Sequence, residues 1–348
     1  MRTIEWKDGV IITIDQTLLP EREVWIELKS CREVAEAIKE MKIRGAPLIG
    51  VAAAYGLALT AYHSKAESRE AFLKEIERSA EMLKMTRPTA VNLFWAIERI
   101  LNKVKNIEND VEALKKAVID ESNRIANEDV EVNRKIGEYG SRLINDGDTI
   151  LTYCNAGKLA TVDYGTALAV IRVAWEEGKR IRVIASETRP KLQGARLTAY
   201  ELMRDGIPVT LITDNMIGYI MSKGLINKVI VGADRIVRDA VINKIGTYTV
   251  AILAHEHSIP FYVAAPSSSF DLNAFARDVI IEERSPEEVT HVGSTRIAPL
   301  GVSVLNPAFD ITPIKYVDAI ICEKGILTKE DFSSLLEEGV FQENVKQR

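Results

Sequence analysis

The chain has 348 residues, enough for about two domains. Hydrophobic residues make up 47% and charged residues 27%, a balance that excludes a mainly disordered or collagen-like protein. Lysine and arginine number 45 against 50 aspartate and glutamate, a net charge of −5, so the basic surplus of a general nucleic-acid binder is missing. We expect a folded protein with no nucleic-acid partner.

The sequence favours a cytoplasmic protein. Residues 1–10 mix charged and apolar side chains, unlike the apolar core of a secretory signal. The longest apolar stretch, 46–59, contains two glycines and is shorter than the roughly 20 residues that span a bilayer, so it predicts a buried helix and no membrane partner. Cys31, Cys154 and Cys322 are odd in number and lack CxxC spacing, which argues against disulfides and zinc.

The first 125 residues predict a mainly helical domain with a small β element. Apolar and polar residues alternate over 4–28 around an Asp8-Gly9 turn, as in a hairpin. Helical periodicity and proline-led helix starts follow. The predicted helices cover residues 31–41, 47–62, 68–85, 90–105 and 111–145.

Residues 126–348 predict an α/β domain with a Rossmann-like parallel sheet. Short β-branched runs alternate here with stretches of helix length, which favours right-handed crossovers and a sheet covered on both faces. The active site of such a domain lies beyond the carboxyl ends of its strands. The predicted strands are DTILTY, RIRVIAS, PVTLIT, NKVIVGAD, PFYVAA and DAIIC.

The sequence gives no sign of a cofactor or a metal. No GxGxxG follows the first strand of the α/β domain and no GxxxxGK[ST] occurs, so neither a dinucleotide nor a nucleoside triphosphate is indicated. His255-Glu256-His257 does not place two imidazoles on one helix face. It is more typical of a polar helix end, where histidine suits the helix dipole.

Two segments of the first domain resemble anion sites. Arg44-Gly45-Ala46-Pro47 and Thr86-Arg87-Pro88-Thr89 each precede a predicted helix. A guanidinium beside free backbone N–H groups suits a phosphate. The alternative is an exposed arginine ahead of an ordinary helix start.

The second domain places further candidates after its strands. Cys154 follows the first strand at a predicted helix start, where a thiol has a lowered pKa; the alternative is a small buried apolar residue. Asp234 ends another strand, and the alternative there is a turn cap. Asn243-Lys244 lie at a predicted helix start, and the loop 187–194 adds two cations and an amide. This convergence predicts a site for a sugar phosphate.

Six segments follow one another along the chain: IRGAPLIGVAAAYGLAL, TRPTAVNLFWAI, LTYCNAGKLATVDYGTAL, ETRPKLQGARLTAYEL, TDNMIGYIM and VGADRIVRDAVINKIGTY. In this order they resemble the methylthioribose-1-phosphate isomerase family over nearly the whole chain. That family is related to regulatory subunits of the translation-initiation exchange factor and to ribose-1,5-bisphosphate isomerases. The resemblance implies an intramolecular aldose-ketose isomerase of methionine salvage, a pathway of methionine biosynthesis, and a homodimer.

The resemblance also assigns roles to residues. Its catalytic pair falls on Cys154 and Asp234. Its substrate contacts fall on Arg44, Gly45, Ala46, Arg87, Gln193, Asn243 and Lys244.

Three features depart from the family pattern. Tyr153 stands where histidine is common, Lys158 stands where a small residue is usual, and the stretch 238–242 is short and poor in glycine. They leave the catalytic groups in place but put details of the pocket in doubt.

Two alternatives remain open. Ribose-1,5-bisphosphate isomerase has a second phosphate in place of the methylthio group, and an apolar pocket around carbon 5 would reject it. An exchange-factor subunit is an interaction protein without chemistry, and the presence of both Cys154 and Asp234 argues against it.

Overall fold

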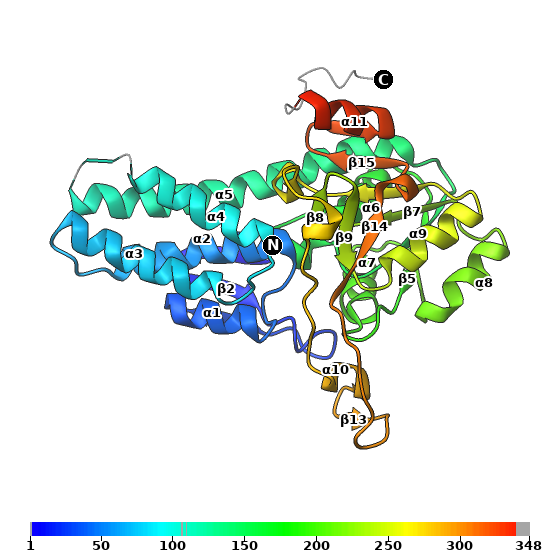
Figure 1. Ribbon diagram of the computed structural model, residues 1–348, viewed down its shortest axis with the longest axis horizontal. Coiled ribbons are helices and arrows are strands. Elements are labelled where there is room, and N and C mark those ends of the chain that lie inside the picture. The colour runs from blue at the N-terminus through cyan, green and yellow to red at the C-terminus, as the bar shows by residue number, and fades with distance from the viewer. Residues whose placement is uncertain (1, 106, 109, 339–348) are drawn as a thin grey trace. The chain divides into compact units, whose positions relative to one another are not determined.

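The computed structural model describes residues 2–105, 107–108 and 110–338 (Figure 1). The chain folds into two compact units. Unit 1 holds residues 1–133 and 157–165, and unit 2 holds residues 134–156 and 166–348. The predicted domain boundary lies at 125/126, and the second segment of unit 1 was not predicted.

Unit 1 is mainly helical with a small antiparallel sheet, as predicted. The strands pair in the order β1-β2-β3, so the expected hairpin exists and gains a third strand. The elements are β1 (Ile4–Lys7), β2 (Val10–Ile14), β3 (Trp25–Leu28), α1 (Cys31–Lys39), α2 (Ala46–His63), α3 (Arg69–Lys84), α4 (Val91–Lys105) and the first part of α5 (Val111–Gly140).

Helix α2 forms the centre of unit 1. It packs against α1, α3 and α4, and Leu48, Ala53 and Leu57 are fully buried. Gly50 touches the start of α4: a Cβ there would lie 2.8 Å from the Asn92 carbonyl oxygen. The amino ends of α2 and α4 therefore lie at the same end of unit 1.

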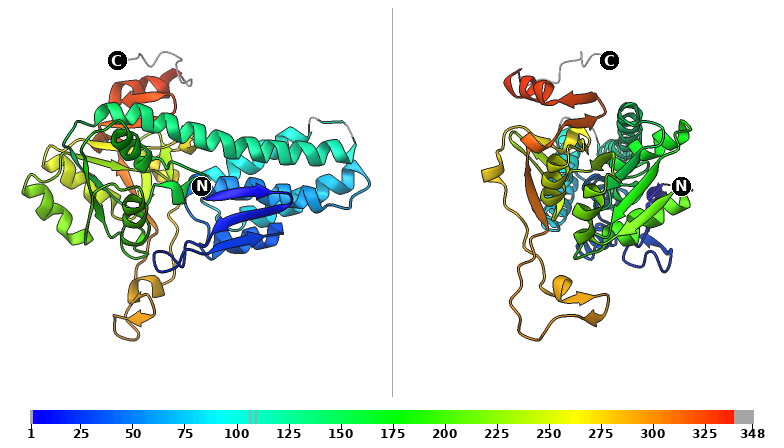
Figure 2. Two further views of the ribbon diagram at one scale, coloured as in Figure 1. Left: turned by 180° about the vertical axis from the view of Figure 1, so that it is seen from behind. Right: turned by 90° about the vertical axis from the view of Figure 1, so that its right-hand side faces the viewer.

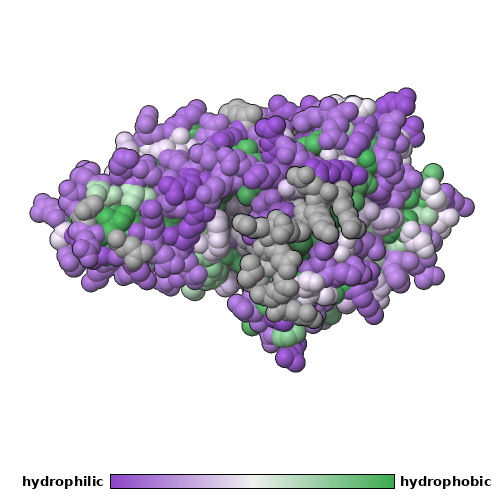
Figure 3. Space-filling view, turned by 90° about the horizontal axis from the view of Figure 1, so that it is seen from above, coloured by the Kyte–Doolittle hydropathy of each residue, from purple (hydrophilic) through white to green (hydrophobic). Residues whose placement is uncertain are grey.

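By length and composition α2 could cross a membrane, but 83% of it is buried inside the protein. This confirms the expected buried helix. The face of the molecule in Figure 3 is mostly hydrophilic, with hydrophobic residues in small separate areas.

Unit 2 contains the predicted α/β fold. All six predicted strands are present, as β4, β5, β6, β7, β10 and β15. Its elements are β4 (Thr149–Thr152), α6 (Ala167–Glu176), β5 (Arg182–Ser186), α7 (Ala199–Arg204), β6 (Val209–Ile212), α8 (Ile217–Ser222), β7 (Lys228–Val231), β8 (Arg235–Val237), β9 (Ala240–Lys244), α9 (Thr247–Glu256), β10 (Phe261–Ala264), β11 (Phe270–Asp271), α10 (Glu287–Thr290), β12 (His291–Val292), β13 (Thr295–Arg296), β14 (Phe309–Pro313), β15 (Ala319–Cys322), β16 (Gly325–Thr328) and α11 (Lys329–Glu338).

The main sheet has the order β16-β15-β10-β7-β4-β5-β6. Its pairs are parallel except β15 with β16. From β4 the chain builds outward through β5 and β6, and then returns to add β7 on the other side. The strand order therefore reverses between β4 and β7, and open α/β sheets bind ligands beyond the strand ends at such a point.

One face of this sheet is covered by α8, α9 and α11. Leu151, Ile184 and Val229 stand in register on neighbouring strands and share a buried cluster with Val250 of α9 and Phe332 of α11. Because alternate residues of a strand point to opposite faces, the buried Ile150 and Val183 point to the other face. The sheet is buried on both faces, which explains its continuous apolar runs.

A second sheet, of order β11-β8-β9-β14, was not predicted from the sequence. Asn243 and Lys244 end strand β9 instead of starting a helix, and Gly246 is the N-cap of α9. Strand β9 is buried at all five positions although it contains an asparagine and a lysine. These polar residues, and the short length of β8, hid the β pattern.

Residues 279–308 leave this sheet as an excursion that carries α10, β12 and β13. Its two legs meet at a β-bridge between Glu283 and Pro307. Figure 2 shows the excursion standing clear of both sheets of unit 2.

Unit 1 contains a carboxyl group that should make its stability depend on pH. Burial raises the pKa of Asp129 in α5 to about 7, although the Val162 N–H and Asn133 oppose the shift; the Val162 N–H donates to the carboxylate at 2.7 Å. The unfolded group titrates near pH 3.8, so the folded state binds more protons between these values. Stability from this group is full below about pH 4 and falls as the pH rises to about 7.

We expect Asp129→Asn to remove this loss, because an amide oxygen still accepts from Val162 and carries no charge. From pH 5 to pH 8 the variant should gain roughly 2 kcal/mol relative to the parent protein, measured by denaturant unfolding. Glu131→Gln, an exposed carboxylate on the same helix, is the control. Equal pH slopes for parent and Asp129→Asn would contradict the assignment.

Candidate active site

The predicted catalytic pair lies where the strand order of the main sheet reverses. Cys154 follows β4 and Asp234 follows β7, and these strands are paired neighbours. The two strand ends approach closely, because a Cβ at Gly232 would lie 2.7 Å from the Ala156 Cβ. The structure therefore brings the thiol and the carboxyl to one edge of the sheet.

Two threonine hydroxyls hold the backbone of Cys154. The residue has φ +63°, a left-handed conformation that costs free energy for a side chain other than glycine. Its N–H donates to Thr188 Oγ1 at 2.8 Å, and Thr198 Oγ1 donates to its carbonyl oxygen at 2.6 Å. These bonds fix a strained backbone at a half-buried cysteine that is not in a disulfide.

A buried polar network supports Thr198. Asn155 Nδ2 donates to Thr198 Oγ1 at 3.2 Å and to Glu201 Oε1 at 2.9 Å. The other oxygen of Glu201 accepts from Arg172 Nη2 at 2.7 Å, and Arg172 Nε donates to Asp205 at 2.6 Å. Both side chains of the Arg172–Glu201 pair are nearly inaccessible, so each charge depends on its partner.

The predicted helix start at Cys154 is wrong. The next regular element is a 3-10 turn, η2 (Lys158–Ala160), and α6 begins only at Ala167. Between them the chain passes through unit 1, because 157–165 packs there and cannot continue as a helix of unit 2. Cys154 therefore does not lie at a helix start.

The loop after β5 brings Gln193 to the same edge. Gln193 is 3% exposed, and its Oε1 is buried with no hydrogen-bond partner among the described residues. The neighbouring Gly194 is pressed against the strand end: a Cβ there would lie 1.7 Å from the Ser186 carbonyl oxygen and 2.9 Å from Thr188 Oγ1. An unpaired buried amide oxygen suits a ligand hydroxyl.

The two cations of this loop have other partners. Arg189 donates to backbone carbonyls of α10 and β12, and Lys191 Nζ lies 3.7 Å from Glu288. In the structure both contact the excursion. Asp214 holds the loop start by accepting from the N–H groups of Thr188 (2.9 Å) and Arg189 (2.7 Å).

Asp234 joins the two sheets of unit 2. Its N–H donates to the Ile242 carbonyl oxygen at 3.0 Å, which ties it to the β8–β9 hairpin beside Asn243. The following residue, Arg235, forms an ion pair with Asp271. The carboxyl is thus positioned by β7 on one side and by the hairpin on the other.

Asn243 and Lys244 are adjacent in β9 and point to opposite faces. Asn243 Nδ2 donates to Thr247 Oγ1 at 3.1 Å, at the start of α9. Lys244 Nζ donates to the Ala308 carbonyl oxygen at 2.8 Å and lies 4.9 Å from the Phe309 ring centroid. The two side chains therefore cannot reach a ligand from the same side of the strand.

Tyr153 and Asp310 fix the turn after β9. Tyr153 Oη donates to the Ile245 carbonyl oxygen at 3.0 Å, and burial raises the pKa of its phenol. Gly246 has φ +103°, and a Cβ there would lie 2.1 Å from Tyr153 Oη. Asp310 accepts from the Gly246 N–H at 2.7 Å, and burial raises its pKa to about 6.

The remaining predicted residues lie in unit 1. Arg44 is buried, and Gly45 is the N-cap of α2 with φ +98°. A Cβ at Gly45 would lie 2.5 Å from the Ala160 Cα, in the segment that follows Cys154 along the chain. Ala46 opens α2, whereas Arg87 lies in the turn before α4 and not at its first residue. Since the amino ends of α2 and α4 lie together, Arg44 and Arg87 lie at the same end of unit 1.

Among the described residues, no group of three or more His, Cys, Asp or Glu side chains is arranged to hold a metal ion. His255 and His257 lie at the end of α9, where His255 packs against Tyr316. The groups available at the sheet edge are a thiol, a carboxyl and amides.

Comparison with known proteins shows the family of this chain. Residues 42–329 match the model of the initiation factor 2 subunit family. The chain is 55% identical over 330 residues to a methylthioribose-1-phosphate isomerase of Acetivibrio thermocellus, covering 94% of this chain and 96% of the relative. This chain belongs to the initiation factor 2 subunit family and groups with its methylthioribose-1-phosphate isomerases.

Two solved structures resemble the whole chain. The 5-methylthioribose 1-phosphate isomerase of Pyrococcus horikoshii has a TM-score of 0.90 and 48% identity, covering 97% of this chain and 95% of that one. A structure from A. fulgidus, described as translation initiation factor eIF-2B subunit delta, has a TM-score of 0.86 and 54% identity, covering 97% and 99%. Proteins of this family with very similar folds thus carry both names.

Sequence reasoning missed the residues that hold this isomerase-type site in shape. Thr188 and Thr198 fix the backbone of Cys154, and Asp214 and Asp310 each cap a loop or helix at the sheet edge. No motif signals such roles, because each depends on a partner far away in the sequence. Thr198 had one local sign: it ends a π-helix, η3 (Gly194–Thr198), an element that often marks functional sites.

We expect Thr198→Val to lower kcat roughly tenfold or more with a smaller change in KM, because the Cys154 carbonyl and Asn155 lose their partner and the thiol moves. Steady-state kinetics measure the effect. Thr312→Val is the matched control, since Thr312 is also fully buried but its hydroxyl has no hydrogen-bond partner in the described part of the chain. Equal kinetics for the two variants would show that Thr198 does not position Cys154.

Proposed function

We propose that this chain is an intramolecular aldose-ketose isomerase that converts 5-methylthioribose 1-phosphate to 5-methylthioribulose 1-phosphate in methionine salvage. The observation that carries the proposal is that Cys154 and Asp234 follow the paired strands β4 and β7 at the reversal point of the sheet, in a chain 55% identical over nearly its full length to methylthioribose-1-phosphate isomerases.

The substrate dictates the chemistry. Phosphate on carbon 1 blocks the simple ring opening that ordinary aldose isomerases use. In our proposal Asp234 is the acid that protonates the ring oxygen as its bond to carbon 1 breaks, so it enters the reaction protonated. General acid catalysis of this kind contributes about 10²- to 10⁴-fold.

Turnover of both candidate sugar phosphates tests the proposal. We expect the purified protein, without added nucleotide or metal, to form ketose from 5-methylthioribose 1-phosphate and not from ribose 1,5-bisphosphate. Asp234→Asn should retain less than about a tenth of kcat, and Asp163→Asn, a carboxylate outside the proposed site, is the control. Preferred turnover of the bisphosphate would replace the substrate assignment.

The A. fulgidus neighbour's description supports a second candidate, an exchange-factor subunit without chemistry. Failure to turn over either sugar phosphate, with tight binding to a translation initiation factor, would favour it.

The hydrogen transfer has two routes. In one, carbon 2 passes a hydride to cationic carbon 1, the carbon 2 hydroxyl loses its proton to form the ketone, and the Cys154 thiolate stabilises the transient charge. In the other, Cys154 removes the carbon 2 proton and the resulting enolate is protonated at carbon 1. We favour the hydride route, because none of the proposed site residues is a histidine or glutamate that could act as the base.

Single-turnover reaction in heavy water separates the routes. We expect carbon 1 of the product to carry no solvent deuterium, as measured by mass spectrometry. Reaction of substrate deuterated at carbon 2 is the control, and its label should appear on carbon 1. Substantial solvent deuterium on carbon 1 would make Cys154 the base.

We also propose a homodimer and a cytoplasmic location. Large apolar side chains on the excursion support the first: Ile280 is 81% exposed, and Leu300 and Leu305 are each 87% exposed, a density typical of interfaces. Light scattering of the purified protein measures its mass. None of the three cysteines is in a disulfide, which supports a reducing compartment, and fractionation of the source cells would check the location.

A further inference from the structure

The loop after β5 connects two parts of the proposed site. Thr188 binds the Cys154 N–H, and Gln193 presents a buried amide oxygen that has no hydrogen-bond partner in the described part of the chain. The loop is strained between them, since Thr188 has φ +65° and Leu192 has φ +58°. A strained loop keeps its shape only if neighbouring structure holds it.

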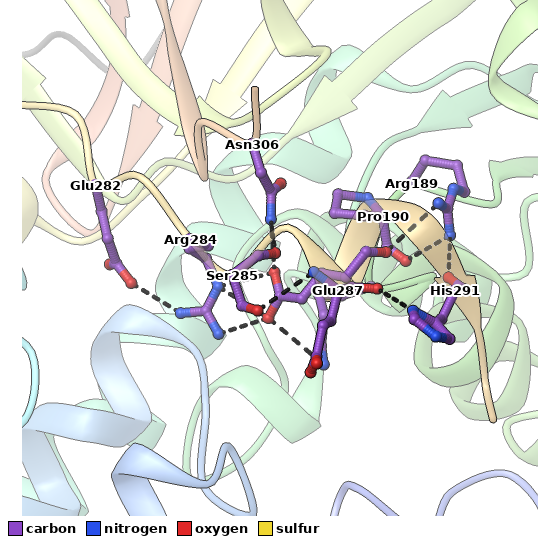
Figure 4. A network of polar contacts seen from close by, with 10 residues as sticks. Arg189, Pro190, Glu282, Arg284, Ser285, Glu287, His291 and Asn306 are labelled. Atoms are coloured by element: carbon purple, nitrogen blue, oxygen red, sulfur yellow. Dashed lines mark hydrogen bonds and ion pairs between the residues drawn. The ribbon is translucent and has the colours of Figure 1, made fainter. Parts of the chain in front are cut away.

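Arg189 supplies such a hold from the excursion. Its guanidinium donates to the carbonyl oxygens of Val289 at 2.8 Å, His291 at 3.4 Å and Glu288 at 3.5 Å, and to that of Pro190 in its own loop at 3.0 Å. Figure 4 shows the side chain directed at these carbonyls, where α10 passes into β12. A planar group with five N–H donors suits a cluster of acceptors in a way that a lysine ammonium does not.

The excursion is itself braced where Arg189 binds it. The Glu288 carboxylate accepts from Arg284 Nη2 at 2.7 Å and from Asn306 Nδ2 at 3.2 Å. Burial acts to raise the pKa of Glu288, but the Arg284 contacts outweigh it and hold the pKa below its usual value. Asn306 is 3% exposed and also donates to the Ser285 carbonyl oxygen at 2.8 Å. Arg284 and Asn306 therefore join the two legs of the excursion and hold α10 (Figure 4).

We propose that Arg189 is a positioning residue: it fastens the loop of Thr188 and Gln193 to the excursion, so that residues 279–308 determine how Cys154 and Gln193 meet the substrate. The proposal rests on the proposed function for the identity of the substrate. It differs from a direct role, in which the Arg189 charge binds the substrate phosphate.

Four variants separate these roles: Arg189→Ala, Arg189→Lys, Arg284→Ala and the Arg189→Ala/Arg284→Ala double variant. We expect Arg189→Ala and Arg189→Lys each to lower kcat/KM roughly ten- to a hundredfold, through both KM and kcat. Arg284→Ala, which loosens α10, should reproduce part of this loss. The double variant should be no worse than Arg189→Ala, because both changes break one connection.

Arg296→Ala, an exposed arginine at the tip of the same excursion, is the control and should leave kcat/KM unchanged. Near-normal activity of Arg189→Lys would indicate a simple charge contact, and additive losses in the double variant would indicate independent roles. Either result, or an unchanged kcat/KM in Arg189→Ala, would overturn the proposal. Melting temperatures confirm folding, and Arg189→Lys serves as the milder variant.

Alkylation of Cys154 by iodoacetamide gives a readout that needs no turnover. Peptide mass spectrometry separates Cys154 from the buried Cys31 and Cys322. We expect about threefold or faster labelling of Cys154 in Arg189→Ala, since the loop that holds its N–H opens more often, and no change in Arg296→Ala. If the parent protein isomerised no sugar phosphate, the proposed function would fail, but the labelling rate would still test whether Arg189 fastens the loop to the excursion. Unchanged labelling of Cys154 in Arg189→Ala would overturn the positioning role.

Discussion

The peptide groups around Cys154 set the main constraint on this structure. A left-handed cysteine is stable only while its N–H and its carbonyl oxygen keep their partners, and both partners are threonine hydroxyls from one connection of the sheet. Thr188 follows β5 directly, and Thr198 ends the π-helix before α7. The whole β5–α7 connection is therefore needed to hold the turn after β4 in its shape.

The need to hold this turn explains why so many buried polar groups lie behind the site. The Thr198 hydroxyl can donate to Cys154 while it accepts from Asn155, and Asn155 in turn needs an acceptor, which Glu201 supplies. A buried carboxylate needs a cation, and Arg172 provides it while also forming an ion pair with Asp205. Each group is satisfied by the next, so losing one would leave others buried and unpaired, at about 1 to 3 kcal/mol each.

Much of the fold was predictable because its signals are local. The apolar runs of β4, β5, β7, β10 and β15, the apolar stretch of α2 and the periodicity of α1, α3 and α4 stand in the sequence without reference to other elements. The strand ends then indicated Cys154 and Asp234 as neighbours. This works because parallel strands present their carboxyl ends at one edge of a sheet.

The predictions that failed depend on non-local structure. The segment 157–165 returns to unit 1 through contacts such as that of Ala160 with Gly45, and no helical pattern after Cys154 could reveal it. Strand β9 hides a buried asparagine and lysine whose partners, Thr247 and the Ala308 carbonyl, are set by the second sheet. The cations of the 187–194 loop suggested an anion site, yet their partners lie about a hundred residues later.

Under the proposed function Asp234 acts as an acid, and the charges beside it affect this role. A nearby cation would favour its ionised form, and Arg235 is the cation next to it in sequence. Arg235 opens strand β8, and its guanidinium forms an ion pair with Asp271, so its charge is largely balanced.

The bound substrate acts in the opposite direction. Its ring oxygen and its phosphate share carbon 1, so an acid that reaches one lies close to a dianion, and a nearby negative charge favours the protonated carboxyl. Substrate binding would therefore protonate the acid that the reaction needs. Under the proposed function, the ion pair with Asp271 would keep the charge of Arg235 from opposing this effect.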